Sequence, residues 1–164
     1  MEGRGGQNRV LTILKEEGEM TQRALTERLG IQPGSASEII GKLEKGGCAK
    51  VVVNDLARCD MAEAVEDAFR YDRLVLATTT YNGDIFPFMK EFIHHLTERT
   101  YRNRTVALME NGSWAPMAAK VMTKMLEGSK DLTFAENTVK IFSALTDENR
   151  QQIKALAKEL CQNA

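Results

Sequence analysis

LVLATTTYNGDIF, residues 74–86, is the stretch that decides the fold. Its first four residues, 74–77, are short and wholly apolar, which is typical of a strand buried on both faces of a parallel sheet. The polar loop 78–86 follows directly. Ligands of open parallel sheets bind at the carboxyl ends of the strands, so this loop is a candidate binding site.

A second loop of the same kind, ENGSWAP (110–116), follows the apolar run 106–109. Both loops combine small polar residues with an aromatic residue. Tyr81, Phe86 and Trp114 could sandwich a flat ring, and the glycine in each loop would let the backbone approach the polar edge of that ring. The alternative is that TYNG is an ordinary turn and Trp114 a core aromatic.

Residues 48–164 alternate between strand and helix patterns. The strands are expected at 50–53, 74–77, 106–109, 132–134 and 138–141, and the helices at 61–71, 87–96, 117–126 and 147–161. The last helix should bury Ile153, Leu156 and Leu160 on one face. This alternation predicts an α/β fold, a parallel sheet with helices on both faces.

Residues 1–47 show no convincing strand, and their apolar residues fall at helical spacing. We expect a first helix with Leu11 and Leu14, a second with Leu25 and Leu29, and a third with Ile39, Ile40 and Leu43 on its inner side. Three short helices with a tight turn make a helix-turn-helix. Gly46-Gly47 then marks a boundary, so we predict two domains, 1–47 and 48–164.

Three segments, VVVNDLARCDMAEAVEDAFRYDRLVLATTTYNGDIFPFMKEFI (51–93), NRTVALMENGSWAP (103–116) and AAKVMTKML (118–126), resemble the flavodoxin-like domain of flavodiiron proteins, the A-type flavoproteins. The resemblance covers about residues 49–160. It implies FMN as cofactor, electron transfer as the activity if the chain is an enzyme, and a redox partner protein. It also implies the residues around the flavin, which are Thr78, Thr80, Tyr81, Asn82, Gly83, Asn111, Gly112 and Trp114. No residue is expected to be catalytic.

This chain departs from that family at three places. The family usually has proline where Thr79 stands and glycine where Asp84 stands. The Asp84 charge should disfavour anionic reduced flavin by Coulomb repulsion. The resemblance also begins at the second strand of the family, so the first strand and the phosphate loop are expected to be missing and FMN affinity to be weak.

The first strand of such a sheet is central, so its absence would leave a gap. The strand 50–53 could move into the vacant slot, and Arg58 in the loop 54–60 would then offer one phosphate contact. Alternatively, the unpaired strand would invite a second copy of the chain and form a homodimer.

The segment 6–47, and above all TQRALTERLGIQPGSASEIIGKLEK (21–45), resembles the helix-turn-helix of MarR-type winged-helix repressors. The resemblance implies DNA as a partner, with Gln32, Ser35, Ser37 and Lys42 facing it and Thr21, Gln22 and Arg23 near its backbone. The wing that should follow Lys45 is absent. Residues 1–47 hold as many Lys and Arg as Glu, which predicts weak DNA binding. The alternative is a small helical cap with a solvated charged face.

The composition of the chain indicates its protein class and its expected location. With 43% hydrophobic and 27% charged residues the chain should be globular, and its net charge of −1 gives no bias toward membranes or nucleic acid. No apolar run is long enough for a membrane span, and the first ten residues lack the core of a secretion signal. Cys48, Cys59 and Cys161 show neither metal-ligand spacing nor a disulfide framework, so a cytoplasmic location is expected. The adjacent His94 and His95 do not predict a metal site.

Three functions are therefore open. The first is an FMN-binding electron-transfer module joined to a helix-turn-helix. The second is a DNA-binding transcriptional regulator in which the flavodoxin-like half serves as redox sensor or dimerisation module. The third is a chimeric or relic protein with neither activity.

Overall fold

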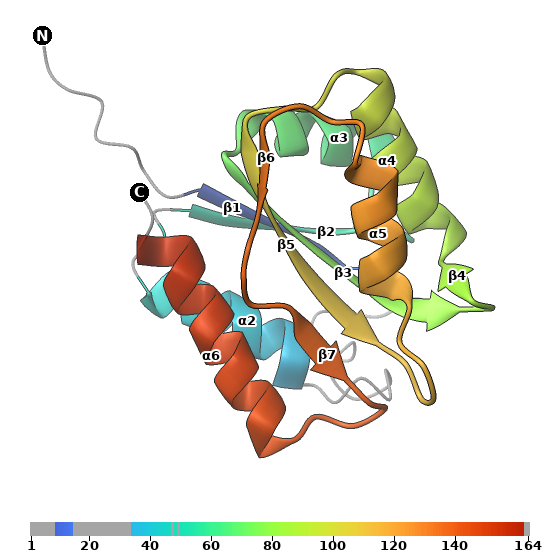
Figure 1. The fold of residues 1–164 in the computed structure, drawn as a ribbon. Helices are drawn as coiled ribbons and strands as arrows, with labels where there is room; N and C mark the ends of the chain where they lie inside the picture. The colour runs from blue at the N-terminus through green and yellow to red at the C-terminus, as the bar shows by residue number, and fades with distance from the viewer. Residues whose placement is uncertain (1–8, 15–33, 47, 49, 163–164) are drawn as a thin grey trace, which may run out of the picture.

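A parallel sheet between two layers of helices forms the centre of the molecule (Figure 1). The computed structural model describes residues 9–14, 34–46, 48 and 50–162. The predicted α/β fold class is confirmed, because helices cover both faces of a mostly parallel sheet.

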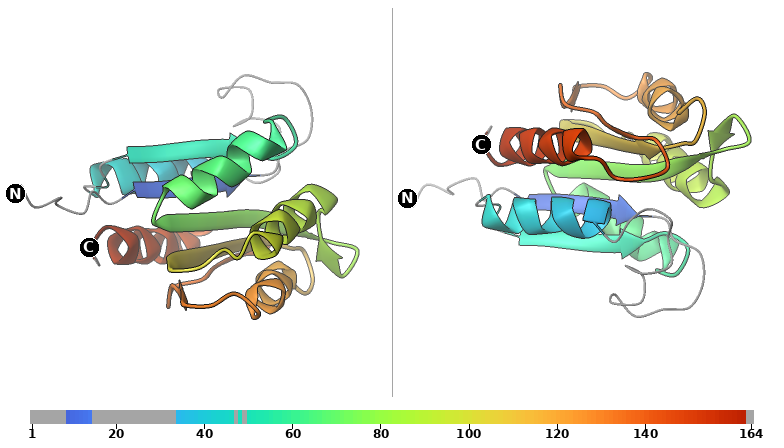
Figure 2. Two further views of the ribbon diagram at one scale, coloured as in Figure 1. Left: turned by 90° about the horizontal axis from the view of Figure 1, so that it is seen from above. Right: turned by 90° about the horizontal axis from the view of Figure 1, so that it is seen from below.

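The strand order of the sheet is β2-β1-β3-β5-β6, as the view from above shows (Figure 2). The bounds are β1 Arg9–Leu14, β2 Lys50–Asp55, β3 Arg73–Tyr81, β5 Arg104–Asn111 and β6 Leu132–Phe134. Two short strands complete the sheet: β4, Asp84–Ile85, pairs antiparallel with β3, and β7, Val139–Ile141, pairs parallel with β5. Counting β6 and β7 as one interrupted strand gives the 2-1-3-4-5 order of flavodoxin-like sheets.

Strand β1 corrects the expectation that the sheet lacks its first strand. It pairs in parallel with β2 on one side and β3 on the other, so that Val10 lies opposite both Val51 and Arg73. The prediction that Leu11 and Leu14 belong to a helix is therefore wrong. A spacing of three residues fits a helix locally, but β2 and β3 each offer a row of backbone groups that only an extended segment can pair.

Because β1 occupies the central position of the sheet, the two alternatives that assumed a missing strand there must be revised. Strand β2 stays at the edge of the sheet and does not move inward. The unpaired central strand that would invite a second copy does not exist, so the physical reason for a homodimer falls away and the dimer itself stays a prediction.

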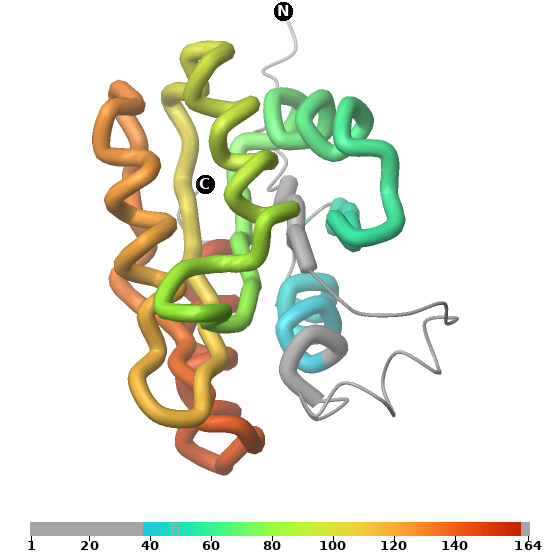
Figure 3. Tube along the Cα trace, turned by 90° about the vertical axis from the view of Figure 1, so that its right-hand side faces the viewer, coloured from blue at the N-terminus to red at the C-terminus, as the bar shows by residue number. Residues whose placement is uncertain are grey.

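The helices form two layers. On one face lie α2, Gly34–Lys45, and α6, Asp147–Gln162; on the other lie α3, Met61–Arg70, α4, Pro87–Glu98, and α5, Ala118–Leu126. Figure 3 looks onto the second layer and shows α5, α4 and α3 side by side.

Successive side chains of the central strands pack alternately into the two hydrophobic cores, one on each face of the sheet. In β3, Leu74 and Leu76 pack with α3, α4 and α5, whereas Val75 packs with α2 and α6. Successive side chains of a strand point to opposite faces, so a strand covered on both sides must be apolar throughout. The prediction from the run 74–77 is confirmed.

The core beneath α2 and α6 joins the beginning and the end of the chain. Ile39 and Leu43 are fully buried, as are Ile153, Leu156 and Leu160 of α6, and all belong to one cluster. The predicted inner faces of both helices are confirmed, with Ile40 partly buried at the margin. Strand β1 and helix α2 thus share a sheet and a core with the remainder; the division into 1–47 and 48–164 stays a prediction.

Cys48 and Cys161 form a disulfide between the end of α2 and the last turn of α6, with their Cα atoms 5.5 Å apart. That separation lies in the ordinary range for disulfides. The expectation that the cysteines form no disulfide is therefore wrong. The pair is 113 residues apart in sequence, so no local spacing could have indicated it.

The central role of β1 can be tested with Thr12→Pro. Thr12 lies opposite Val53 in β2 and Val75 in β3. Proline removes a ladder hydrogen bond in the middle of the sheet, so the free energy of unfolding should fall by about 2 kcal/mol or more. Hydrogen exchange should show that the β3 amides lose protection. Thr12→Val, which keeps a β-branched residue, is the control; unchanged β3 protection in Thr12→Pro would contradict the position of β1.

Candidate functional site

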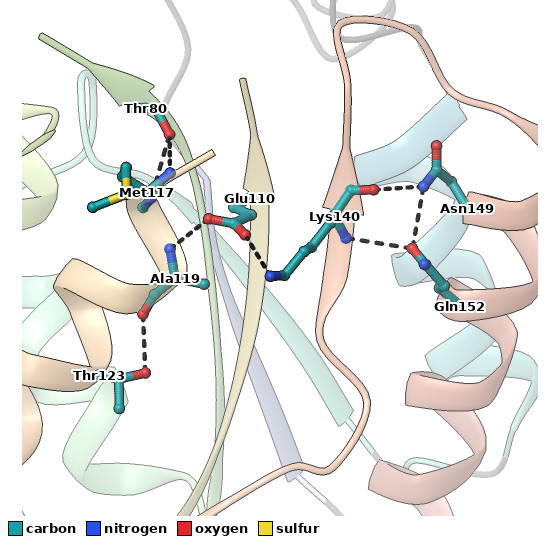
Figure 4. A network of polar contacts seen from close by, with 9 residues as sticks. Thr80, Glu110, Met117, Ala119, Thr123, Lys140, Asn149 and Gln152 are labelled. Atoms are coloured by element: carbon teal, nitrogen blue, oxygen red, sulfur yellow. Dashed lines mark hydrogen bonds and ion pairs between the residues drawn. The ribbon is translucent and has the colours of Figure 1, made fainter. Parts of the chain in front are cut away.

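The two polar loops meet at the carboxyl edge of the sheet, and Thr80 joins them. Its Oγ1 accepts hydrogen bonds from the backbone N–H groups of Met117, at 2.9 Å, and Ala118, at 3.3 Å (Figure 4). The loop 78–86 is thereby attached to the start of α5, directly after the loop 110–116. The prediction that the two loops lie together is confirmed by this contact.

Glu110, the next-to-last residue of β5, is a buried carboxylate at the same junction. It is 2% exposed; one oxygen accepts the N–H of Ala119 at 2.8 Å, and the other lies 3.6 Å from Lys140 Nζ (Figure 4). Glu110 and Thr80 together occupy the first N–H groups of α5. The start of α5 is therefore already capped and is not available to bind an anion.

A third loop, 142–146, which no sequence pattern had indicated, completes this edge. Asn111 Oδ1 accepts the N–H of Ser143 at 3.0 Å, and the N–H of Gly112 donates to Ile141 O at 3.1 Å. These bonds fasten the third loop to the loop 110–116. The signal that could have found it is Phe142, an aromatic residue directly after the strand pattern 138–141.

Each of these three loops carries one exposed aromatic side chain. Tyr81, Trp114 and Phe142 are 51%, 94% and 58% exposed, one on each loop. Phe142 is the residue that the prediction missed. The alternative that Trp114 is a core aromatic is wrong. Phe86 does not face Tyr81 across a gap: the two rings stack on each other with centroids 4.6 Å apart and planes at 22°.

The tip of the first loop is a tight hairpin turn between β3 and β4. Asn82 and Gly83 both have positive φ, 54° and 74°, and Tyr81 lies opposite Asp84. Asn-Gly is the preferred pair for this type of two-residue turn. TYNG is thus a turn as the alternative held, and it is the turn that presents Tyr81 at the edge.

Asp84 is ion-paired, which bears on its expected effect on a flavin. Lys90 Nζ lies 2.5 Å from Asp84 Oδ2, and the N–H of Ile85 donates to Oδ1. The hydrogen bond from Lys90, and then that from Ile85, hold the pKa of Asp84 below its usual value. The carboxylate charge at this position is accordingly compensated by an ammonium group rather than left to face a ligand alone.

Thr78 presents an unsatisfied hydroxyl at this edge. The residue is 5% exposed, and its Oγ1 has no hydrogen-bond partner among the residues that the structure describes. Buried hydroxyls are nearly always hydrogen-bonded, so an orphan hydroxyl beside a binding edge suits a polar atom of a ligand. The aromatic side chains and this hydroxyl fit the ring of FMN.

The predicted contact of Arg58 with the FMN phosphate is not supported. Asp60 caps α3 by accepting the N–H groups of Ala62 and Glu63 at 2.7 and 3.2 Å, and Arg58 lies 3.5 Å from Asp55. A carboxylate therefore occupies the anion position at α3, and the proposed phosphate contact of Arg58 is not supported. The segment directly after β1, where flavodoxin-like sheets carry the phosphate loop, lies outside the described residues.

The residues expected to face DNA are only partly described. Gln32, Thr21, Gln22 and Arg23 lie outside the described residues, as do the side chains of Ser35 and Ser37. Lys42 is half-buried on α2, and Glu38 of the same helix lies 3.5 Å from Arg150 of α6. The next strand that the structure describes after Lys45 is β2, which pairs parallel with β1 and is not half of a hairpin with it.

The sheet order and the two helix layers define a flavodoxin-like fold, and solved structures confirm it. Rubredoxin oxygen:oxidoreductase from Desulfovibrio gigas matches with a TM-score of 0.75 at 15% identity, over 94% of this chain and 35% of its own. The flavodiiron protein of Giardia intestinalis matches at 0.68 and 14%, over 95% and 36%. A Streptococcus pneumoniae flavodoxin matches at 0.72 and 16%, over 95% and 99%. The chain thus spans about a third of the first two proteins and nearly all of the flavodoxin.

Residues 7–50 match a family model described as winged helix-turn-helix DNA-binding. The predicted helix-turn-helix segment is confirmed as a sequence match, and the MarR subtype stays a prediction. The same range contains β1, which the structure places in the sheet. No curated protein matches the chain in sequence.

Two further observations concern the part of the chain that the structure describes. None of its helices combines the length and the hydropathy that crossing a bilayer requires. No cluster of three or more His, Cys, Asp or Glu side chains in it is arranged to hold a metal ion.

The junction at α5 yields a stability prediction. Thr80→Val keeps the shape of the side chain but removes the acceptor of two backbone N–H groups. We expect the free energy of unfolding to fall by about 1–3 kcal/mol, measured by urea denaturation. Thr79→Val, at the neighbouring position, whose hydroxyl makes no hydrogen bond to the residues that the structure describes, should change it by less than about 0.5 kcal/mol. Equal effects in the two variants would contradict the capping role of Thr80.

Proposed function

We propose that the chain is an FMN-binding electron-transfer module whose ring site lies at the carboxyl edge of the sheet. The observation that carries the proposal is the group of exposed aromatics Tyr81, Trp114 and Phe142 on three loops fastened to one another. Exposed large apolar side chains gathered at one place usually mark a binding site. The flavodoxin-like fold makes this edge the expected place for a flat cofactor.

Different residues of the chain would make different contacts with the flavin ring. Tyr81 and Trp114 offer aromatic faces for offset stacking, and Phe86 supports Tyr81 from behind. The Thr78 hydroxyl offers a hydrogen bond to a polar atom of the ring. Gly112 lets Pro116 pack close to the backbone of the second loop, because a Cβ at this position would lie 3.2 Å from Pro116 Cα. FMN, when bound, supplies the one-electron and two-electron chemistry.

The charges at this edge affect which flavin form is favoured. Asp84 is neutralised by Lys90, and Glu110 faces Lys140, so neither carboxylate stands beside the ring without a cation near it. This arrangement lessens the repulsion expected for anionic reduced flavin. A redox partner protein would approach the same edge, where the aromatics are open to solvent.

The test is an FMN titration followed by quenching of flavin fluorescence and by absorbance near 450 nm. Trp114→Ala and Tyr81→Ala should each weaken binding by about 5-fold or more, because stacking contributes about 1 kcal/mol beyond area burial. Phe88→Ala, which removes an exposed aromatic of α4, is the matched control and should bind FMN as the parent does. The proposal fails if the parent chain binds no FMN.

A second candidate function, DNA binding, is favoured by the winged helix-turn-helix match at residues 7–50. In that role the flavodoxin-like half would act as redox sensor or dimerisation module. Residues 1–47 hold as many Lys and Arg as Glu, so binding should be weak and strongly dependent on salt.

Gel shifts at low salt with palindromic DNA test this second function. Ser37→Glu adds a negative charge to α2 and should weaken binding by about 10-fold, whereas Ser129→Glu, in the turn after α5, should not. The absence of any complex at low salt would exclude it. If FMN binding fails as well, the relic interpretation stands.

A further inference from the structure

The Cys48–Cys161 disulfide lies at the amino edge of the sheet, opposite the aromatic loops. Cys48 stands two residues before β2 begins, and Cys161 belongs to the last turn of α6. Figure 1 shows this end of α6 beside the starts of β1 and β2. The site is thus separated from the ring site by the length of the strands, and it is independent of the proposed function.

The backbone at the end of α2 packs closely against the disulfide. A Cβ atom at Gly46 would lie 2.9 Å from Cys161 Sγ and 2.9 Å from Lys42 O, so only glycine fits there. Cys161 Sγ lies 3.6 Å from Leu43 O, and the N–H of Cys48 donates to that same carbonyl at 3.2 Å. Both cysteines are therefore held against the last turn of α2.

The two cysteine residues differ in exposure. Cys48 is 8% exposed, whereas Cys161 is partly exposed at the end of its helix. An attacking thiolate must approach along the sulfur–sulfur axis, and access to the attacked sulfur governs the rate. Exchange should therefore begin at Cys161, with Cys48 as the leaving group.

We propose that Cys48 and Cys161 form a reversible thiol–disulfide site that exchanges with low-molecular-weight thiols and disulfides of the glutathione class. In reduction, a glutathione thiolate attacks Cys161 Sγ, the sulfur–sulfur bond breaks, and Cys48 leaves as a thiolate that takes up a proton. A second glutathione then releases Cys161 as a thiol. The products are two cysteine thiols and one glutathione disulfide; oxidation is the reverse and transfers the same two electrons.

The third cysteine is poorly suited to compete. Cys59 lies in the loop between β2 and α3, where partial burial, and then the charge of Asp55, raise the pKa of its thiol. The nearby carboxylates Asp60 and Glu63 act in the same direction. Little of it is thiolate at neutral pH, and the thiolate is the reactive form. Cys59 should therefore remain a thiol and serve as an internal reference.

The consequence of oxidation is a covalent clamp between α2 and α6. The bond spans 113 positions, and a cross-link over so long a loop strongly restricts the unfolded chain. The clamp reinforces the contact of Ile39 and Leu43 with α6. It would hold in place the helix that the second candidate function assigns to DNA, so the oxidised form is the more rigid of the two.

The test uses the whole chain equilibrated in glutathione buffers from fully reduced to fully oxidised, trapped with N-ethylmaleimide and weighed intact. The reduced chain should take up three labels and the oxidised chain one, on Cys59, with a peptide linking Cys48 to Cys161. The melting temperature of the oxidised chain should be higher than that of the reduced chain. In Cys161→Ala this difference should vanish, and in Cys59→Ala, the matched control, it should persist.

Three outcomes would overturn the inference. The first is three labels in every buffer, which would show that the disulfide does not form. The second is a single label in every buffer, including the fully reducing one, which would show a permanent structural bond. The third is a linkage that involves Cys59. These results come from the parent chain itself, so they do not depend on the folding of a variant, and FMN binding does not enter them.

Discussion

The double pairing of β1 is the constraint on which the remainder of the structure depends. A parallel sheet cannot leave the backbone groups of a central position unpaired, and β1 satisfies one side of β2 and one side of β3. Residues that match a winged helix-turn-helix model thereby contribute a strand to a flavodoxin-like sheet. A helix satisfies its own backbone, whereas a strand needs neighbours. The two neighbours offered by β2 and β3 decide the conformation of residues 9–14.

With the sheet complete, the carboxyl edge is held by side chains that act between elements. Thr80 and Glu110 cap α5 from two different strands, and Asn111 fastens the loop after β7. Lys140 and Asn149 extend the same network into α6 (Figure 4). The polar side chains of these strand ends therefore hold the loops together, and the exposed aromatics remain open to solvent. In the proposed function, such fixed loops would lower the ordering cost of binding a ring.

Helix α6 connects the two chemically distinct edges of the sheet. It begins at Asp147, directly after Thr146, whose hydroxyl accepts the N–H of Asn149 at the end of the loop that carries Phe142. Its last turn contains Cys161, which is bonded to Cys48 at the opposite edge. A redox change at the disulfide would thus act on the helix that packs beneath the whole α2 face, while the flavin chemistry would remain at the aromatic edge.

The sequence by itself determined the α/β class, the strands 74–77 and 106–109, the buried faces of α2 and α6, and the two polar loops, because each depends on local periodicity or composition. Only the tertiary structure decided the rest. Leu11 and Leu14 fit a helix until partners on both sides are known. The loop that carries Phe142 is held by the N–H of Ser143, which donates to Asn111 Oδ1, and Cys48 meets Cys161 across most of the chain. These features are contacts between distant segments, and no local pattern records which distant segments will meet.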